Sequence, residues 1–189
     1  MKTKLIILGC GSSIGVPRID GYWGNCRKKE KKNNRTRCSA IIIKGSNSIL
    51  IDTSPDLRSQ LLLNKIKNIS SVIFTHEHAD QTNGLFELRP FYWKYKKKIN
   101  IYGNLRTIKH LKKAFNFCFT SQFGYPAIVK ANFIKENFAE DILISHALRI
   151  LEGAIPLFLV FVCRMPHINP FSYLFCGEFV CLNSDDSRV

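Results

Sequence analysis

The sequence SVIFTHEHAD, residues 71–80, decides how this chain is interpreted. Its apolar part, residues 72–74, predicts a short buried strand that ends abruptly in two histidines and an aspartate. Polar side chains just beyond a strand lie at a sheet edge, where loops line clefts. His76 and His78 are two residues apart, so in an extended segment both imidazoles point the same way and can reach one cation, and Asp80 adds a carboxylate. These donors suit Zn²⁺, or Mn²⁺ and Fe²⁺ where the geometry opens toward octahedral; the alternative is a solvent-exposed loop.

Strands are predicted on both sides of this segment, because apolar and β-branched residues cluster in short runs. The runs are residues 5–8, 40–43, 49–51, 72–74, 99–102, 157–162, 173–175 and 179–182. The Gly-Glu step at residues 177–178 predicts a hairpin turn, so part of the sheet should be antiparallel. Apart from the run at 157–162, residues 131–170 show neither a helical nor a strand periodicity, and no element is assigned there.

Helices are predicted at two places between these strands. Ser54 followed by Pro55 predicts a helix N-terminus that leads into residues 56–67, where apolar residues recur at helical spacing. Asn104 likewise precedes residues 105–115, whose apolar side chains form one stripe. The mixture of strands and helices predicts an α+β fold class.

Length and composition predict a single globular domain over residues 1–189. The chain is long enough for one hydrophobic core, and its 46% hydrophobic and 22% charged residues exclude disorder and fibrous structure. Seven cysteines without a C-x-x-C pair argue against a zinc ribbon and a disulfide framework and fit a reducing compartment. The longest apolar stretch, residues 154–163, is shorter than the about 20 residues of a membrane helix. We therefore expect a cytoplasmic protein with no membrane partner.

The charge balance is strongly basic. The sequence has 28 Lys and Arg against 14 Asp and Glu, a formal net charge of +14. The excess is concentrated in residues 27–37 (RKKEKKNNRTR) and 94–98 (KYKKK). Such runs could neutralise the phosphates of a nucleic acid or of a small anionic substrate. The alternative is a pair of solvated loops.

Several further blocks of sequence resemble a known family. They are LGCGSSIGVPR (residues 8–18), WGNC (23–26), RTRCSAIII (35–43), SILIDTSPDLRSQLL (48–62) and THEHADQTNGLFELRP (75–90). In order and spacing they resemble the metallo-β-lactamase superfamily of metal-dependent hydrolases, whose hallmark is HxHxDH after a buried strand, and within it the cyclic phosphodiesterase-like branch. The resemblance covers residues 3–115 well and the remainder poorly.

This resemblance implies a metallo-β-lactamase-like four-layer αβ/βα sandwich, incomplete at the C-terminus, with metal bound where strand-end loops converge at one edge. His76 and His78 would bind the first of one or two zinc ions. Asp80 would bind the second and contact the bridging water, which makes it the catalytic residue. Asp52, at the end of the preceding strand, would orient a ligand histidine, as carboxylates do in such sites.

The chain departs from the family pattern at several ligands. Gln81 replaces the final hallmark histidine, and an amide is a poor zinc ligand, so the second metal position is weakened. The third histidine ligand would be His167, with His146 as a backup, or would be absent. The bridging aspartate would be Asp185 or Asp186. Family members continue beyond this point to a last ligand histidine.

The resemblance implies a metal-dependent hydrolase that acts on a phosphodiester or related small anionic phosphate ester. Bound zinc lowers the pKa of its water toward about 7 and so supplies hydroxide as the nucleophile. One alternative is a tRNA-processing endonuclease of the same superfamily, since the basic runs could hold RNA. Another is a truncated, inactive relative. Uncovered apolar faces and sheet edges would also favour homo-oligomers.

Overall fold

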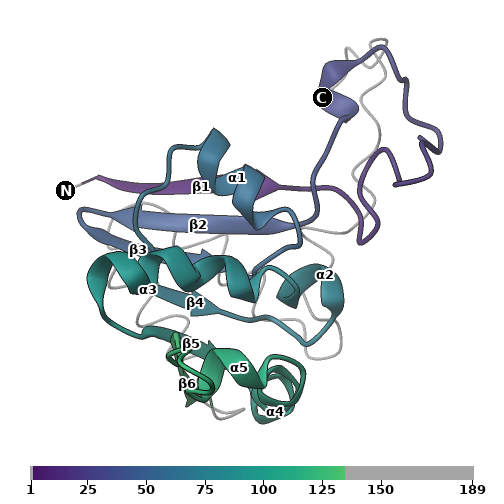
Figure 1. The fold of residues 1–189 in the computed structure, drawn as a ribbon. Helices are drawn as coiled ribbons and strands as arrows, with labels where there is room; N and C mark the ends of the chain where they lie inside the picture. The colour runs from purple at the N-terminus through teal and green to yellow at the C-terminus, as the bar shows by residue number, and fades with distance from the viewer. Residues whose placement is uncertain (1, 135–189) are drawn as a thin grey trace.

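The computed structural model describes residues 2–134, and within them six strands form one mixed sheet (Figure 1). The strands lie side by side in chain order: β1 (Thr3–Gly9), β2 (Ser39–Lys44), β3 (Asn47–Ile51), β4 (Ser71–Ile73), β5 (Ile99–Gly103) and β6 (Val129–Phe133). Strand β2 is antiparallel to both of its neighbours, β1 and β3, whereas β3 to β6 are parallel.

Helices form the connections between the parallel strands. They are α1 (Leu57–Leu63) between β3 and β4; α2 (Ala79–Thr82), the 3-10 helix η2 (Leu85–Leu88) and α3 (Arg89–Tyr95) between β4 and β5; and α4 (Leu105–Ala114) and α5 (Asn116–Phe119) between β5 and β6. A further 3-10 helix, η1 (Lys31–Asn33), lies in the long connection from β1 to β2.

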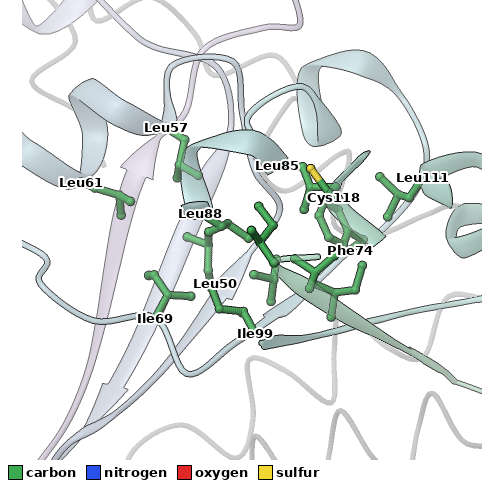
Figure 2. Close-up of a cluster of buried hydrophobic side chains, with 14 of the residues drawn as sticks. Leu50, Leu57, Leu61, Ile69, Phe74, Leu85, Leu88, Ile99, Leu111 and Cys118 are labelled. Atoms are coloured by element: carbon green, nitrogen blue, oxygen red, sulfur yellow. The ribbon is translucent and has the colours of Figure 1, made fainter. Parts of the chain in front are cut away.

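One face of the sheet packs against these helices and forms the hydrophobic core (Figure 2). Leu50, Val72 and Ile101 on three neighbouring strands are fully buried in it. The helical side chains that meet them come from α1, η2, α4 and α5: Leu57, Leu61, Leu85, Leu88, Ile108, Leu111 and Cys118. Burial of each large apolar side chain contributes about 1.5–3 kcal/mol to the free energy of unfolding. This packed layer therefore holds the strands, and the loops that follow them, in fixed positions.

Apolar side chains are buried on the other face of the sheet as well. Ile49, Ile51 and Ile73 alternate with the core residues of β3 and β4, and each is at most 8% exposed. Strands that are apolar on both faces are typical of parallel strands placed between two layers.

The predicted strands at residues 5–8, 40–43, 49–51, 72–74 and 99–102 are confirmed, as is the helix that follows Asn104. The Asn104 side chain accepts a hydrogen bond from the Thr107 backbone N–H at 2.8 Å, which is the N-cap that the sequence indicates. Strand β6 was not predicted. The strands at 157–162, 173–175 and 179–182 and the turn at 177–178 lie outside the described residues.

The helix predicted to start at Ser54 begins instead at Leu57, with Asp56 as its N-cap residue. The Ser54 hydroxyl oxygen accepts a hydrogen bond from the Asp56 backbone N–H at 3.2 Å, so it stabilises the turn before the helix. The Asp56 carboxylate accepts from the backbone N–H and the guanidinium of Arg37 at 2.8 and 3.0 Å, and this contact fixes the helix start against the segment before β2.

The topology brings several loops to the same edge of the sheet. Because β1, β3, β4 and β5 run in one direction, their carboxyl ends lie together, and the amino end of the antiparallel β2 joins them (Figure 1). Ligands of open sheets with parallel strands bind at such an edge. The candidate residues of the SVIFTHEHAD segment follow β4 and therefore lie here.

Candidate metal centre

The candidate site begins where β4 ends. The Phe74 backbone N–H donates to the Tyr102 carbonyl at 2.8 Å and continues the pairing with β5 for one residue beyond Ile73. The chain then leaves the sheet, and His78, in extended conformation, occupies the N-cap position of α2. The two histidines thus lie in the short connection between a buried strand and a helix.

A buried carboxylate from the neighbouring strand fixes this connection. Asp52, 5% exposed and in the left-handed region with a φ of 58°, follows β3 directly. Its two oxygens accept hydrogen bonds from the backbone N–H and from the hydroxyl of Thr75 at 2.8 and 2.7 Å. Asp52 therefore holds Thr75, and with it the start of the histidine segment, to the end of β3.

The same hydroxyl reaches the first histidine. Thr75 Oγ1 lies 2.9 Å from His76 Nδ1. The Thr75 hydroxyl has one hydrogen, and it donates this hydrogen to the Asp52 carboxylate. The hydroxyl oxygen must therefore accept the hydrogen bond from an N–H at His76 Nδ1. This network assigns the tautomer of His76 and leaves Nε2 with its lone pair. The sequence predicted that Asp52 orients a ligand histidine; the structure places Thr75 between them, a residue that the sequence reasoning missed.

The two imidazoles lie on the same side of the segment, as their spacing predicts. Their ring centroids are 4.6 Å apart and the ring planes meet edge to face at 82°. Burial lowers the pKa of His76, the neighbouring His78 lowers it further, and Asp80 and Glu77 act in the opposite direction. His76 is therefore neutral near neutral pH, which is the form that binds a metal ion.

Glu77 lies between the two histidines and forms an ion pair with α4. Its Oε1 is 2.6 Å from Arg106 Nε, and the glutamate side chain is only 17% exposed whereas the arginine is 84% exposed. Burial acts to raise the pKa of Glu77, but a backbone hydrogen bond, Arg106 and the two imidazoles together lower it. Glu77 is thus an ionised carboxylate beside the imidazoles. Neither partner of this pair was identified from the sequence.

Asp80, the predicted catalytic residue, lies on the first turn of α2. Its Oδ2 accepts a hydrogen bond at 3.0 Å from the side-chain amide of Gln81, which is 2% exposed. The Gln81 carbonyl accepts from the Thr53 backbone N–H at 2.7 Å, so α2 is tied to the end of β3. Within the described residues, Asp80 Oδ1 accepts no hydrogen bond and remains available as a donor atom to a cation or as an acceptor of a proton.

The chemistry of these donors fits a divalent metal ion, but the described residues supply only part of a site. His76 Nε2, the ring of His78 and Asp80 Oδ1 are nitrogen and oxygen donors of the kinds that zinc, manganese and iron prefer. Residues 2–134 nevertheless contain no cluster of three His, Cys, Asp or Glu side chains arranged around one point. The other predicted ligands, His167, Asp185 and the alternatives His146 and Asp186, lie outside the described residues and stay predictions.

The two basic runs lie at opposite edges of the sheet. Residues 27–37 belong to the connection from the carboxyl end of β1 to the amino end of β2, which is the edge of the histidines. Residues 94–98 precede β5 and therefore lie at the amino end of the parallel strands (Figure 1). The first run therefore shares a sheet edge with the candidate site, and the second does not. In the part of the chain that the structure describes, no helix is long and apolar enough to cross a bilayer.

Comparison with protein families and solved structures gives consistent likenesses. A family model for the β-lactamase superfamily domain matches residues 47–141, which include β3, β4 and the candidate site. A crystal structure of a diphosphatase from the PhnP family superposes with a TM-score of 0.62 at 30% identity, over 71% of this chain and 51% of that chain. The Zn²⁺-bound PqqB of Methylobacterium extorquens superposes with a TM-score of 0.53 at 21% identity, over 71% of this chain and 50% of that one, and shares the fold.

Two curated proteins are similar in sequence. The octanoyltransferase of Porphyromonas gingivalis is 30% identical over 186 residues, which are 96% of this chain and 37% of that protein. The coenzyme PQQ synthesis protein B of Methylococcus capsulatus is 31% identical over 97 residues, 44% of this chain and 32% of that protein. The chain thus spans about a third of the length of these curated relatives.

Proposed function

Because the chain belongs to the β-lactamase superfamily domain family, we propose that it is a metal-dependent hydrolase that acts on a phosphodiester or related phosphate ester. Family membership supports hydrolysis as the reaction class. The phosphate ester is supported by the likeness to the PhnP-family diphosphatase at 30% identity, and by the basic residues 27–37, which lie at the same edge of the sheet as the candidate site.

The observation that carries this proposal is the pair of imidazoles in edge-to-face contact at the end of β4. His76, through Nε2, and His78 would hold the metal ion, and His167 would complete the nitrogen donors. When bound, a divalent metal supplies a water of lowered pKa and polarises a phosphoryl oxygen. Asp52 and Thr75 keep His76 in the tautomer and orientation that binding needs.

Asp80 has the second role in the proposed reaction. Its Oδ2 is held by Gln81 at 3.0 Å, while Oδ1 accepts no hydrogen bond from residues 2–134 and would accept a proton from the attacking water. An amide hydrogen and a cation compete for the same carboxylate oxygen, so Gln81 favours one well-held metal ion at this centre, with Asp185 as its predicted further carboxylate ligand.

The test is metal content combined with turnover of bis(p-nitrophenyl) phosphate. We expect purified wild type to bind zinc or manganese and to hydrolyse this diester, and His78→Ala to lose both. His110→Ala is the matched control, because His110 lies exposed on α4 and is remote in sequence from the segment. Wild-type protein that takes up only a small fraction of one metal equivalent, or a His78→Ala variant that behaves as wild type, would contradict the proposal.

A second candidate is an RNA-processing endonuclease, which the position of residues 27–37 favours. Contacts to phosphates release counterions, so RNA binding by this basic run should weaken steeply as salt increases. Electrophoretic mobility shifts with a single-stranded RNA at several salt concentrations measure this dependence, and replacing Lys28, Lys29, Lys31 and Lys32 with Gln should flatten it. Binding that is insensitive to both changes would exclude this candidate.

A further inference from the structure

The ion pair between Glu77 and Arg106 joins the histidine segment to helix α4. Glu77 follows the carboxyl end of β4 and Arg106 follows that of β5, and these two strands are adjacent and parallel. Both residues therefore lie at the same edge of the sheet. The distance of 2.6 Å between Glu77 Oε1 and Arg106 Nε defines where the guanidinium is held.

The 2.6 Å contact of this ion pair is made by the Nε atom of the Arg106 guanidinium. An arginine presents five N–H donors in a rigid planar fork, and the Nε contact leaves the four on Nη1 and Nη2. Within residues 2–134, neither of these two nitrogens donates a hydrogen bond, and the Arg106 side chain is 84% exposed. The unused side of the fork is thus accessible to solvent while its position is restrained by Glu77.

The pair differs from an ordinary surface ion pair in the environment of its acid. Exposed pairs are weak because water screens both charges and both side chains lose conformational freedom. Glu77 is largely covered, lies between the two histidines in sequence and restrains Arg106 at the first turn of α4, a turn that contains no acidic residue. An arginine oriented in advance in this way binds an anion with a smaller loss of side-chain entropy.

We infer that Arg106 is an anion-binding residue of this centre, whose two Nη groups donate to the oxygens of a phosphate group placed beside the imidazoles. Guanidinium groups recognise phosphate oxygens through paired, charge-assisted hydrogen bonds. Glu77 acts through Arg106 as a positioning residue. The inference rests on the proposed phosphate-ester function, because it names the residue that would recognise the substrate phosphate.

The experiment measures binding of inorganic phosphate to the full chain, without turnover. Phosphate is titrated into metal-free protein at constant ionic strength, with chloride as the comparison anion, and the Nε–H signal of Arg106 is followed by NMR. A second titration follows heat on mixing for wild type, Arg106→Gln, Arg106→Lys and Lys113→Gln. The last variant is the matched control, since Lys113 lies exposed on the last turn of the same helix and makes the same change in charge.

We expect phosphate to shift the Arg106 signal and Arg106→Gln to bind phosphate about tenfold more weakly, as lost charge-assisted hydrogen bonds imply. Arg106→Lys keeps the positive charge but loses the planar set of N–H donors, so its phosphate affinity should lie between those of wild type and Arg106→Gln. Lys113→Gln should stay within about twofold of wild type. Because Arg106 is exposed, these variants should melt at the wild-type temperature.

Three results would overturn the inference: no phosphate binding by wild type, equal weakening by Arg106→Gln and Lys113→Gln, or binding that leaves the Arg106 signal unchanged. If one of these occurs while the chain still hydrolyses the diester, the proposed function stands and only the role of Arg106 fails. Phosphate binding that depends on Arg106 in a chain without metal uptake or turnover would instead support this inference and exclude the proposed reaction.

Discussion

The hydroxyl of Thr75 connects two residues that the sequence singled out for different reasons. Asp52 was expected to orient a histidine, and His76 was expected to be a metal ligand; Thr75 lies between them, at 2.7 Å from the carboxylate and 2.9 Å from Nδ1. The spacing of the two histidines could be predicted, because side-chain direction in an extended segment depends only on sequence separation. The intermediate hydroxyl could not, because it depends on a contact between Asp52 and Thr75, which are 23 residues apart in sequence and follow two neighbouring strands.

Replacing Thr75 with valine tests this connection. Valine keeps the shape but removes the hydroxyl, so His76 loses its acceptor at Nδ1. We expect zinc affinity to fall about 10- to 100-fold, the usual cost of losing a residue that orients a metal ligand. Competition with a chromophoric chelator measures the affinity, and ¹⁵N NMR of the metal-free protein reports the His76 tautomer. Thr75→Ser retains the hydroxyl and should bind zinc as wild type does; unchanged affinity in Thr75→Val would contradict the assignment.

The pKa of His76 gives stability a defined pH dependence. Burial lowers this pKa below the ordinary value of 6.5, and His78 adds to the effect. The unfolded chain therefore binds a proton that the folded chain does not, so the free energy of unfolding falls as pH drops below about 6.5. The loss is complete only once the pH is below the folded pKa.

Thermal melting of metal-free protein between about pH 8 and about pH 5.5 measures this dependence. In His76→Gln, the melting temperature should fall less steeply as the pH is lowered, because the buried imidazole is absent. His110→Gln, on the exposed side of α4, should keep the wild-type slope. Equal slopes in wild type and His76→Gln would show that protonation of His76 does not contribute.

A helix starts where the sequence predicts when the contact that fixes its start joins residues that are close in sequence. It starts elsewhere when that contact comes from a distant part of the chain. Helix α4 starts where Asn104 indicates, because its cap is a hydrogen bond between residues three apart. Helix α1 starts later than Ser54 indicates, because the deciding contact is with Arg37, 19 residues away. The sequence spacing of Leu62, Ile66 and Ile69 predicted one apolar helical stripe, yet Leu62 is 63% exposed, and Ile69 lies beyond the helix and is buried in the segment before β4.

For the molecule as a whole, the predicted α+β metallo-β-lactamase fold is confirmed by the family match and by the PhnP-family structure. Composition indicated a basic protein but could not say where the charge lies. Only the strand directions show that residues 27–37 lie at the sheet edge of the candidate centre and that residues 94–98 lie at the opposite edge. The donors available for a metal ion were likewise predictable by type, whereas the ion pair between Glu77 and Arg106 joins two different connections of the sheet and depends on the tertiary fold.

The edge strand β1 leads to a prediction about self-association. In the described part of the chain β1 pairs only with β2, and Leu5 and Ile7, which alternate with residues packed into the core, are 37% and 49% exposed. An exposed edge strand with apolar side chains favours pairing with a second copy. We expect concentration-dependent association in sedimentation velocity, and Ile7→Lys should reduce it because a charged side chain at an edge opposes pairing. Leu63→Lys, which changes an 83% exposed leucine on α1, is the control that should leave association unchanged. A wild-type chain that sediments as a monomer at all concentrations would refute the prediction.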